Sequence, residues 1–351
     1  MKKLENLFNL LKSKKLDAVL ISDEYNMRYL SGCDYEGYFF ATQNRTYILT
    51  DSRYTEVAEN ESKNCDVITL TTSYGDIVKE FINDNKIKTL GFEDLHMTYD
   101  KYVYFSNLGA TLVPIGDSVE TFRQIKDEYE IEALRTAESI GDKAFDHILG
   151  VIKPGMTEME IAIEIELALK RNGAEKTSFD TIVASGINGS MPHAVPGNKK
   201  VQMGELITMD FGCKYKGYCS DMTRTIMLGE PNDEQRKIYN VVLEAQLKAL
   251  DFIRAGVKGK DVDKVARDTI SEYGYGKFFG HGLGHSVGLF IHEGPNLSPR
   301  EERIIQENMI ETIEPGIYVP GFGGVRIEDM VLVTKNGCEN LAKSKKELII
   351  L

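Results

Sequence analysis

The chain has 351 residues, of which 42% are hydrophobic and 27% are charged, and its formal net charge at pH 7 is -12. This composition is that of an ordinary globular protein with room for two domains. The negative charge argues against nucleic acid as a partner, because phosphate binding needs a basic surface. No apolar run approaches the ~18 residues that a membrane span requires, so no membrane partner is expected either.

Cysteine usage and the N-terminal residues indicate where the protein works. The five cysteines form no CxxC pair. Residues 1–15 carry leucines at helical spacing and lack the continuous apolar stretch of a signal peptide. Scattered thiols in a chain without an export signal are typical of a reducing compartment. The sequence therefore predicts a cytoplasmic protein with reduced cysteines.

Short apolar strands alternate with amphipathic helices in the first third of the chain, a pattern typical of a small α/β domain. Residues 76–83 read as a helix. The segments that read as buried strands are 17–22, 45–50 and 89–93. The character of the chain changes near Gln124. We place the boundary there, between an N-terminal domain over residues 1–124 and a larger domain over residues 125–351.

Helical signals open the second domain, and strands follow. Acidic residues crowd the first turns of a long helix that starts near Lys126, where the helix dipole favours them. A second helix starts at Thr157, which forms a capping-box pattern with Glu160. The rest of the chain reads mostly as strands and glycine-rich turns, with helices near 234–253 and 259–273. The sequence thus predicts an α+β fold.

A first pair of acidic residues lies on two strands joined by a polar turn. If the strands form a simple hairpin centred between Tyr215 and Lys216, Asp210 lies directly opposite Asp221 on the same face. Opposed Cβ atoms in a hairpin are about 4.5–5.5 Å apart, so the two carboxylates repel unless a cation lies between them. A solvated strand face is the alternative, although the apolar neighbours of Asp210 argue against full exposure.

A second acidic pair repeats this arrangement near the C-terminus. A hairpin centred on Gly321 brings Glu314 opposite Glu328. Two consecutive acidic pairs in one domain favour a shared site over unrelated surface charges.

The few histidines of the chain cluster in sequence. His281, His285 and His292 fall within one glycine-rich segment, and His193 lies in a Ser-Met-Pro-His segment. The glycines between the first two argue against a helix, so we expect a loop or a strand end. A lone histidine is more often structural than a ligand, but three beside two acidic pairs favour a site.

Four carboxylates with one or two imidazoles form a mostly oxygen-lined donor set. Such donors suit Mn²⁺, Co²⁺ or Zn²⁺ better than a soft thiolate site would. Four negative charges balance two divalent ions, so the residues indicate a two-metal site.

At these residues the chain resembles the pita-bread metallopeptidases, which include methionine aminopeptidase, aminopeptidase P, prolidase and the creatinase fold. The resemblance covers the whole chain. It implies a C-terminal pita-bread domain, a smaller creatinase-like N-terminal domain and two divalent metal ions per subunit, manganese foremost, with cobalt or zinc as options. The implied metal ligands are Asp210, Asp221, His285, Glu314 and Glu328.

Further residues resemble the proline-specific branch of this family, aminopeptidase P and prolidase. His193, His281 and His292 match histidines that shuttle protons or hold the substrate. Tyr318 and Arg326 match the tyrosine after Glu-Pro-Gly and the arginine before the last ligand. The resemblance implies catalytic roles for these three histidines and Arg326, and substrate binding by His193, His292, Tyr318 and Arg326. It also implies a homodimer.

The implied reaction is hydrolysis of the bond between a first residue and a following proline by a hydroxide that two metal ions activate. Glu314 would move the proton, so it counts among both the ligands and the catalytic residues. The sequence leans slightly toward an Xaa-Pro aminopeptidase acting on proline-containing peptides. An Xaa-Pro dipeptidase, or prolidase, stays open as the alternative. A metal-free creatinase and a non-enzymatic pita-bread binding protein are further alternatives, against which the intact ligand set argues.

Overall fold

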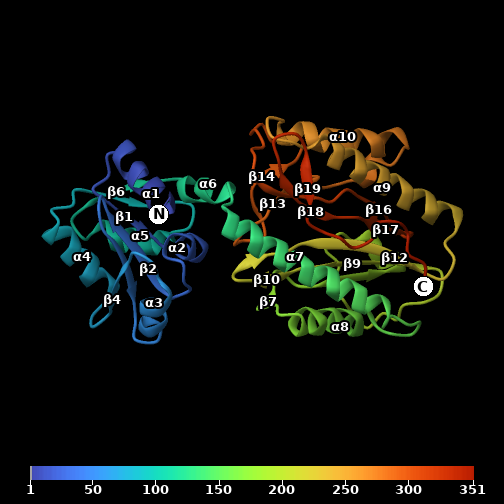
Figure 1. Ribbon diagram of the computed structural model, residues 1–351, viewed down its shortest axis with the longest axis horizontal. Coiled ribbons are helices and arrows are strands. Elements are labelled where there is room, and N and C mark those ends of the chain that lie inside the picture. Colours follow the sequence, from blue (N-terminus) through green and yellow to red (C-terminus); the bar gives the residue numbers. More distant parts are fainter. Residues whose placement is uncertain (1) are drawn as a thin grey trace. The chain divides into compact units, whose positions relative to one another are not determined.

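The computed structural model describes residues 2–351 (Figure 1), which form two compact units, one through Arg123 and one from Gln124 to Leu351. The strands of the first unit are β1 (Ala18–Ile21), β2 (Gly37–Thr42), β3 (Thr46–Thr50), β4 (Asp66–Thr69), β5 (Thr89–Phe92) and β6 (Thr111–Pro114). Its helices are α1 (Lys2–Ser13), α2 (Glu24–Ser31), α3 (Thr55–Glu61), α4 (Tyr74–Asp84), α5 (Tyr99–Ser106) and α6 (Ser118–Gln124), which ends at the boundary.

The strands of the first unit form one mixed sheet in the order β4-β3-β2-β1-β5-β6. β1 pairs antiparallel with β2 and parallel with β5, so β1 lies at the centre of the sheet. All four residues of β1 are buried. β1, β3, β5 and α4 confirm the strands and the helix predicted from the sequence, whereas β2, β4 and β6 were not predicted.

The second unit combines four long helices with several small sheets. Its helices are α7 (Glu128–Leu149), α8 (Glu158–Arg171), α9 (Asp233–Phe252) and α10 (Gly259–Glu272). The strands of its first half are β7 (Lys176–Thr177), β8 (Ile182–Ser185), β9 (Glu205–Phe211), β10 (Cys213–Tyr215), β11 (Tyr218–Cys219) and β12 (Met222–Leu228). Those of its second half are β13 (Gly284–Ser286), β14 (Glu293–Leu297), β15 (Ile310–Ile313), β16 (Gly316–Val319), β17 (Gly323–Arg326), β18 (Asp329–Val333) and β19 (Cys338–Asn340).

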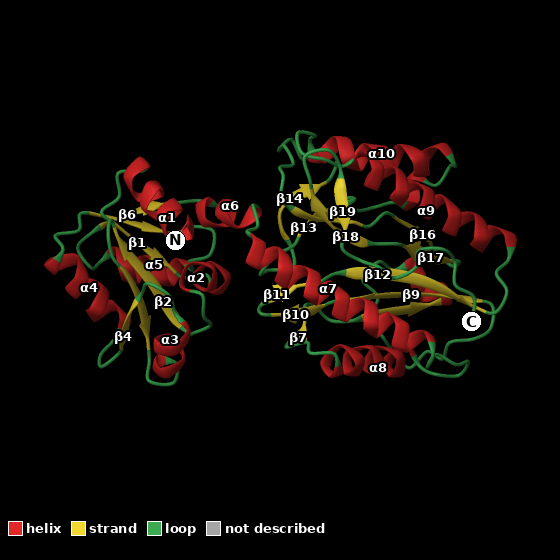
Figure 2. Cartoon of the chain, viewed as in Figure 1, coloured by secondary structure: helices red, strands yellow, loops and turns green. Residues whose placement is uncertain are grey.

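Each half of the second unit packs its strands on a pair of helices. In the first half the sheets run β12-β9-β8 and β11-β10-β7, and α7 packs on α8. In the second half they run β14-β13-β15-β18-β19 and β16-β17, and α9 packs on α10. Figure 2 shows the strands lying between α9 and α10 on one side and α8 on the other. The polar centre between the two halves is where the predicted site residues fall.

The long helices begin where the sequence indicates. Thr157 caps α8 and accepts a hydrogen bond from the Glu160 backbone N–H, while the Glu160 side chain accepts from the Thr157 backbone N–H. Asp127 and Glu130 form the same capping box at α7. Each box satisfies two backbone donors that a helix start otherwise leaves unpaired, so these residues determine where the helices begin.

Strand β9 separates an apolar face from the predicted acid. Ile207, Met209 and Phe211 are fully buried in the core that α7 and α8 share with this sheet. Because side chains alternate along a strand, Asp210 points to the opposite face, where it is 8% exposed. The alternative of a solvated acidic face is therefore wrong for Asp210.

The predicted register is correct for the second hairpin and wrong for the first. Gly316 pairs with Arg326, and the same register places Glu314 opposite Glu328, as predicted. In the first hairpin Asp210 pairs with Thr223, two residues beyond Asp221. A shift by two residues keeps the same face, so the two aspartates stay neighbours on a diagonal of roughly 7–8 Å between their strands.

The turn between β10 and β11 causes this difference. Tyr215 pairs with Tyr218, which leaves Lys216 and Gly217 as the two central turn residues. Both have positive φ, 50° and 79°. Two-residue hairpin turns with positive φ at both positions match the twist of the flanking strands, which moves the centre of the hairpin one position along the chain.

Two further observations bear on the sequence predictions. Of the helices between Lys2 and Leu351, none combines the length and apolar character that crossing a bilayer requires. All five cysteines are free thiols. Burial raises the pKa of Cys213 and Cys219 to about 12, so both stay protonated near neutral pH.

Candidate active site

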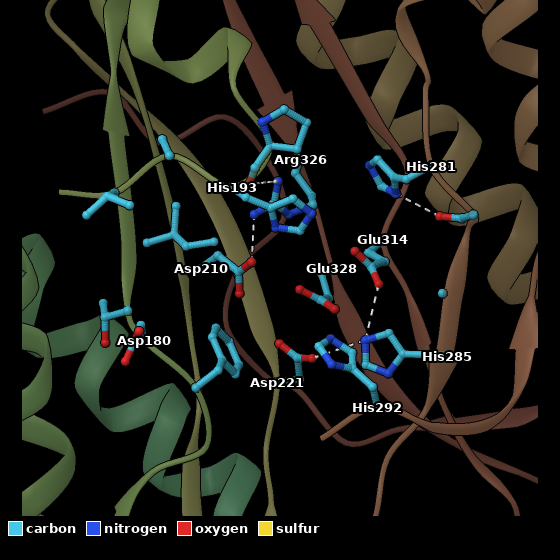
Figure 3. A pocket seen from close by; sticks show the side chains of 18 of the residues that line it. Asp180, His193, Asp210, Asp221, His281, His285, His292, Glu314, Arg326 and Glu328 are labelled. Atoms are coloured by element: carbon cyan, nitrogen blue, oxygen red, sulfur yellow. Dashed lines mark hydrogen bonds and ion pairs between the residues drawn. The ribbon is translucent and has the colours of Figure 1, made fainter. Parts of the chain in front are cut away.

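A cavity of about 700 Å³ lies at the polar centre of the second unit (Figure 3). Most of the predicted site residues line this cavity, although they come from segments more than a hundred residues apart. Those that line it are His193, Asp210, Asp221, His281, His285, His292, Glu314, Arg326 and Glu328. Tyr318, the remaining predicted residue, is hydrogen-bonded to both His281 and Arg326.

The four acids sit in strands or at breaks in strands. Asp210 lies near the end of β9, and Asp221 occupies the break between β11 and β12. Glu314 and Glu328 lie opposite each other where the ladder between β15–β16 and β17–β18 is interrupted. A break in the ladder frees the backbone from regular pairing, so these side chains can turn toward one centre.

Asp221, His285 and Glu328 each offer one ligand atom within 4.8 Å of the others. The Nε2 atom of His285 lies 3.6 Å from Oδ2 of Asp221 and 3.5 Å from Oε1 of Glu314. On the other side of the ring, Nδ1–H donates to the carbonyl of Ser286 at 3.1 Å. That hydrogen bond leaves the lone pair of Nε2 directed at the acids, as in metal-binding histidines.

The burial of these groups perturbs their protonation. Burial, and then the neighbouring carboxylates, raises the pKa of Asp221 and Glu328 well above the usual range. Burial raises the pKa of Glu314 to about 8, an effect that Arg326 reduces and Asp210 increases. Burial also lowers the pKa of His285 to about 4, so the ring is neutral at pH 7. Shifts of this kind concentrate at functional sites.

The donor set fits a pair of divalent cations. One oxygen of Asp210, Oδ1, is buried without a hydrogen-bond partner among residues 2–351. Nearby carboxylates that repel one another and a neutral imidazole with a lone pair directed at them both favour a bound cation. The oxygen-rich set with one nitrogen is the chemistry expected for Mn²⁺, Co²⁺ or Zn²⁺ rather than for a thiolate-selective metal.

Two threonines that the sequence analysis did not single out hold the glutamates in place. Oγ1 of Thr223 donates to Oε2 of Glu328 at 2.7 Å, and Oγ1 of Thr312 donates to Oε1 of Glu314 at 3.1 Å. The sequence signal was spacing: each threonine lies two residues from a predicted acid, Thr223 from Asp221 and Thr312 from Glu314. Residues two apart on a strand share a face, so both threonines could have been placed at the site.

A chain of hydrogen bonds runs from Asp210 through Arg326 and Tyr318 to His281. Arg326 donates through Nη2 to Oδ2 of Asp210 at 2.6 Å and through Nη1 to the hydroxyl of Tyr318 at 2.9 Å. Tyr318 O–H in turn donates to Nε2 of His281 at 2.9 Å, and Nδ1–H of His281 donates to the carbonyl of Gly282 at 2.7 Å. Both ring nitrogens of His281 are thus engaged within the protein.

The other two histidines are more open to the cavity. His193 and His292 are both exposed. The ring of His292 packs edge-on against His285, with 4.7 Å between the ring centroids. Both imidazoles line the cavity, and burial, followed by the charge of His193, lowers the pKa of His292.

Comparison with known proteins identifies the two units. Residues 132–335 match the model of metallopeptidase family M24, and residues 3–125 match that of the creatinase/prolidase N-terminal domain. The chain belongs to metallopeptidase family M24. It is therefore a metal-dependent peptidase with a creatinase-like N-terminal domain and a C-terminal pita-bread domain, as the sequence predicted.

Relatives and solved structures resemble this M24 chain over its full length. An Xaa-Pro dipeptidase of Pyrococcus horikoshii is 39% identical over 99% of this chain and 98% of its own. A solved Xaa-Pro dipeptidase from Bacillus anthracis is 42% identical, with a TM-score of 0.98 over 100% of this chain and 99% of its own. A solved X-Pro aminopeptidase from Thermotoga maritima is 39% identical, with a TM-score of 0.91 over 98% of this chain and 100% of its own.

Proposed function

We propose that this chain is an Xaa-Pro dipeptidase that binds two divalent cations and hydrolyses dipeptides with proline in second position. The convergence of four carboxylates and His285 on one small cavity is the observation that carries the peptidase chemistry. The preference for dipeptides rests on the Pyrococcus and Bacillus relatives. These relatives support the alternative weighed in the sequence analysis better than its slight lean toward an aminopeptidase.

We assign the ions to the residues that the resemblance names: Asp210, Asp221, His285, Glu314 and Glu328. The burial of Asp210, Asp221 and Glu328, the mutual repulsion of the carboxylates and the unpartnered oxygen of Asp210 support this assignment. When bound, divalent cations would supply Lewis acidity, which polarises a scissile carbonyl and lowers the pKa of water. We propose manganese as the native ion, with cobalt and zinc as the other candidates.

The side chains of the cavity supply the proton transfers. Glu314 accepts a proton from the water that attacks the carbonyl carbon before proline. It then returns the proton to the proline nitrogen as the C–N bond breaks. Thr312 holds one oxygen of Glu314 for this exchange. His193 and His292 donate hydrogen bonds to the developing oxyanion and to the free carboxylate of the substrate.

Arg326, which lines the cavity, and Tyr318, which does not, act mainly by positioning other residues in this proposal. Arg326 is 3% exposed and donates to Asp210, Tyr318 and Thr223. Tyr318 lies between Arg326 and His281. These contacts support a role in holding Asp210 and His281 in position, so direct capture of the substrate falls to His193 and His292.

The size of the cavity agrees with a small substrate. Ligand sites for small molecules typically enclose about 300–1,000 Å³, and this cavity measures about 700 Å³. We expect Xaa-Pro dipeptides to be cleaved with a kcat/KM at least ~10-fold above that of Xaa-Pro-Yaa-Yaa peptides. Differences in contacts within a single binding pocket can produce a ratio of this size. Steady-state kinetics on both series, after chelation and reloading with Mn²⁺, Co²⁺ or Zn²⁺, measure this ratio.

The matched control is the Xaa-Ala series, which should resist cleavage. Faster cleavage of the tetrapeptides would instead identify an Xaa-Pro aminopeptidase, the activity named for the Thermotoga structure. Equal cleavage of Xaa-Pro and Xaa-Ala substrates would contradict proline specificity altogether.

A further inference from the structure

The loop that carries His193 is held from three sides. It covers residues 186–198 of the connection between β8 and β9, begins with a short 3-10 helix (Gly186–Ser190), and its middle part forms one wall of the cavity. Val195 in this loop is 84% exposed although it lines the cavity, so its side chain contributes little to holding the loop in place. The position of His193 therefore depends on how the rest of the loop is fixed.

A buried glutamate outside the cavity holds the start of this loop. Glu158 lies in the first turn of α8 and is 1% exposed. Its Oε1 accepts hydrogen bonds from the backbone N–H and the hydroxyl of Ser185, both at 2.8 Å, and from Nδ2 of Asn188 at 3.0 Å. The start of the helix adds a favourable positive potential, so the carboxylate is stable there although it is buried.

The end of the loop returns to the same point. The backbone N–H of Glu158 donates to the carbonyl of Lys199 at 3.0 Å. Nζ of Lys199 donates to the hydroxyl of Ser185 at 2.7 Å and to both oxygens of Glu205 at 2.8 Å. Glu158 and Lys199 thus meet at Ser185, which closes the base of the loop.

The middle of the loop is pressed against β17. Nη1 of Arg326 donates to the carbonyl of Pro192 at 3.4 Å, one residue before His193. A Cβ atom on Gly189 would lie 3.0 Å from the backbone nitrogen of Gly324, and a Cβ on Gly324 would lie 2.1 Å from the carbonyl oxygen of Gly189. The loop therefore has a defined place over the cavity once its base is closed.

We propose that Glu158 is a positioning residue that sets the place of His193 at the substrate, by closing the base of the loop over residues 186–198. Glu158 does not line the cavity and so acts only through the loop. Its loss leaves the donors of Ser185 and Asn188 without their buried acceptor. Because unsatisfied buried donors cost free energy, the loop should rearrange to give them other partners. This inference rests on the proposed peptidase activity, in which His193 contacts the substrate.

The test compares Glu158→Ala with Glu158→Gln on an Xaa-Pro dipeptide with the metal-loaded enzyme. Glu158→Ala should lower kcat/KM by about 10- to 100-fold, because displacing a substrate-positioning group by about 1 Å has effects of this size. Glu158→Gln keeps an acceptor for Ser185 and should recover most of the loss. Glu166→Ala, on the same helix and only partly buried, is the matched control and should behave like the wild type.

Coupling to His193 separates positioning from general stability. If Glu158 acts through His193, Glu158→Ala should cost at most ~2-fold in a His193→Ala background, because coupled residues are not additive. Asn188→Ala offers a milder variant should Glu158→Ala fold poorly, and the same loss of coupling is expected of it. Full additivity in both double variants would overturn the proposal.

Amide hydrogen exchange gives a readout that needs no substrate. Glu158→Ala should speed exchange across residues 186–198 while α9 and α10 stay protected. Unchanged exchange in that segment would overturn the positioning role even if the enzyme is active. If Glu158→Ala speeds exchange but the wild-type protein cleaves no Xaa-Pro peptide, the proposed function is refuted and the role of Glu158 in fixing the loop still stands.

Discussion

Replacing Asp221 with asparagine should lower the rate of peptide hydrolysis by more than ~100-fold. Residues that only hydrogen-bond to a metal ligand typically cost about 10- to 100-fold, and a ligand itself should cost more. The change keeps the shape of the side chain but removes an anionic oxygen from the group that Asp221 forms with His285 and Glu328. The fold should persist, because Asp221 is surrounded by carboxylates that repel it. In the chelated protein, Asp221→Asn should therefore raise the melting temperature.

The kinetics of metal-loaded protein and the thermal unfolding of chelated protein measure the two effects. Asp251→Asn is the matched control, since Asp251 is an exposed residue of α9. The assignment of Asp221 as a ligand is wrong if a metal-replete Asp221→Asn protein cleaves at the wild-type rate.

Chelation should make the stability of the protein fall as the pH rises from 6.5 to 8. The pKa of Glu314 is about 8 in the folded protein, against an ordinary value of 4.5. The folded form therefore keeps a proton that the unfolded chain has released, and stability declines with pH over this interval by up to about 1.4 kcal/mol per pH unit for one such group. The pKa values of Asp221 and Glu328 are shifted in the same direction.

Below pH 6.5 two histidines oppose this trend. Burial lowers the pKa of His281 and His285 from 6.5 to about 4, so their contribution to stability grows as the pH rises from 4 to 6.5. Above pH 6.5 the difference between chelated and metal-loaded protein isolates the ligand carboxylates, because His96 and Glu311, whose pKa values are also raised, lie outside the ligand set and titrate in both forms. With bound metal the ligand carboxylates are already ionised in the folded state, so the decline should become shallower.

Denaturant unfolding at pH 6.5, 7.2 and 8, with and without metal, measures the slope. Glu314→Gln in the chelated protein is the control, and its slope should be shallower than that of the wild type. A chelated protein whose stability holds constant or rises between pH 6.5 and 8 would contradict the electrostatic account of the site.

The parts of the fold with local signals could be predicted from the sequence. The capping box at Thr157 and the acidic first turns after Lys126 placed the two long helices, since such signals lie within a few neighbouring residues of a helix start. The central strand β1 was predicted because its four residues form a short run of apolar side chains, and all four are buried in the structure. The outer strands β4 and β6 were missed, and both are short and only partly buried, so no periodic apolar pattern marks them.

The site shows the same division. The glycine turn near Gly321 determined the register of Glu314 and Glu328 without any knowledge of the fold. The prediction that Asp210 pairs with Asp221 was wrong because the turn is centred on Lys216 and Gly217, one position later than expected, and this shifts the whole ladder. The partners of Glu158 could not be predicted at all, because Ser185 and Asn188 lie roughly thirty residues away and only the folded chain brings them to the start of α8.

The most direct test of the account is the number of metal ions that each chain binds. We expect elemental analysis of purified protein, stripped by chelation and then dialysed against Mn²⁺, Co²⁺ or Zn²⁺, to find two ions per chain for at least one of these metals. The same protein with Asp221 changed to asparagine should hold fewer. A wild-type chain that retains none of the three metals would show that the four carboxylates and His285 do not form a metal centre.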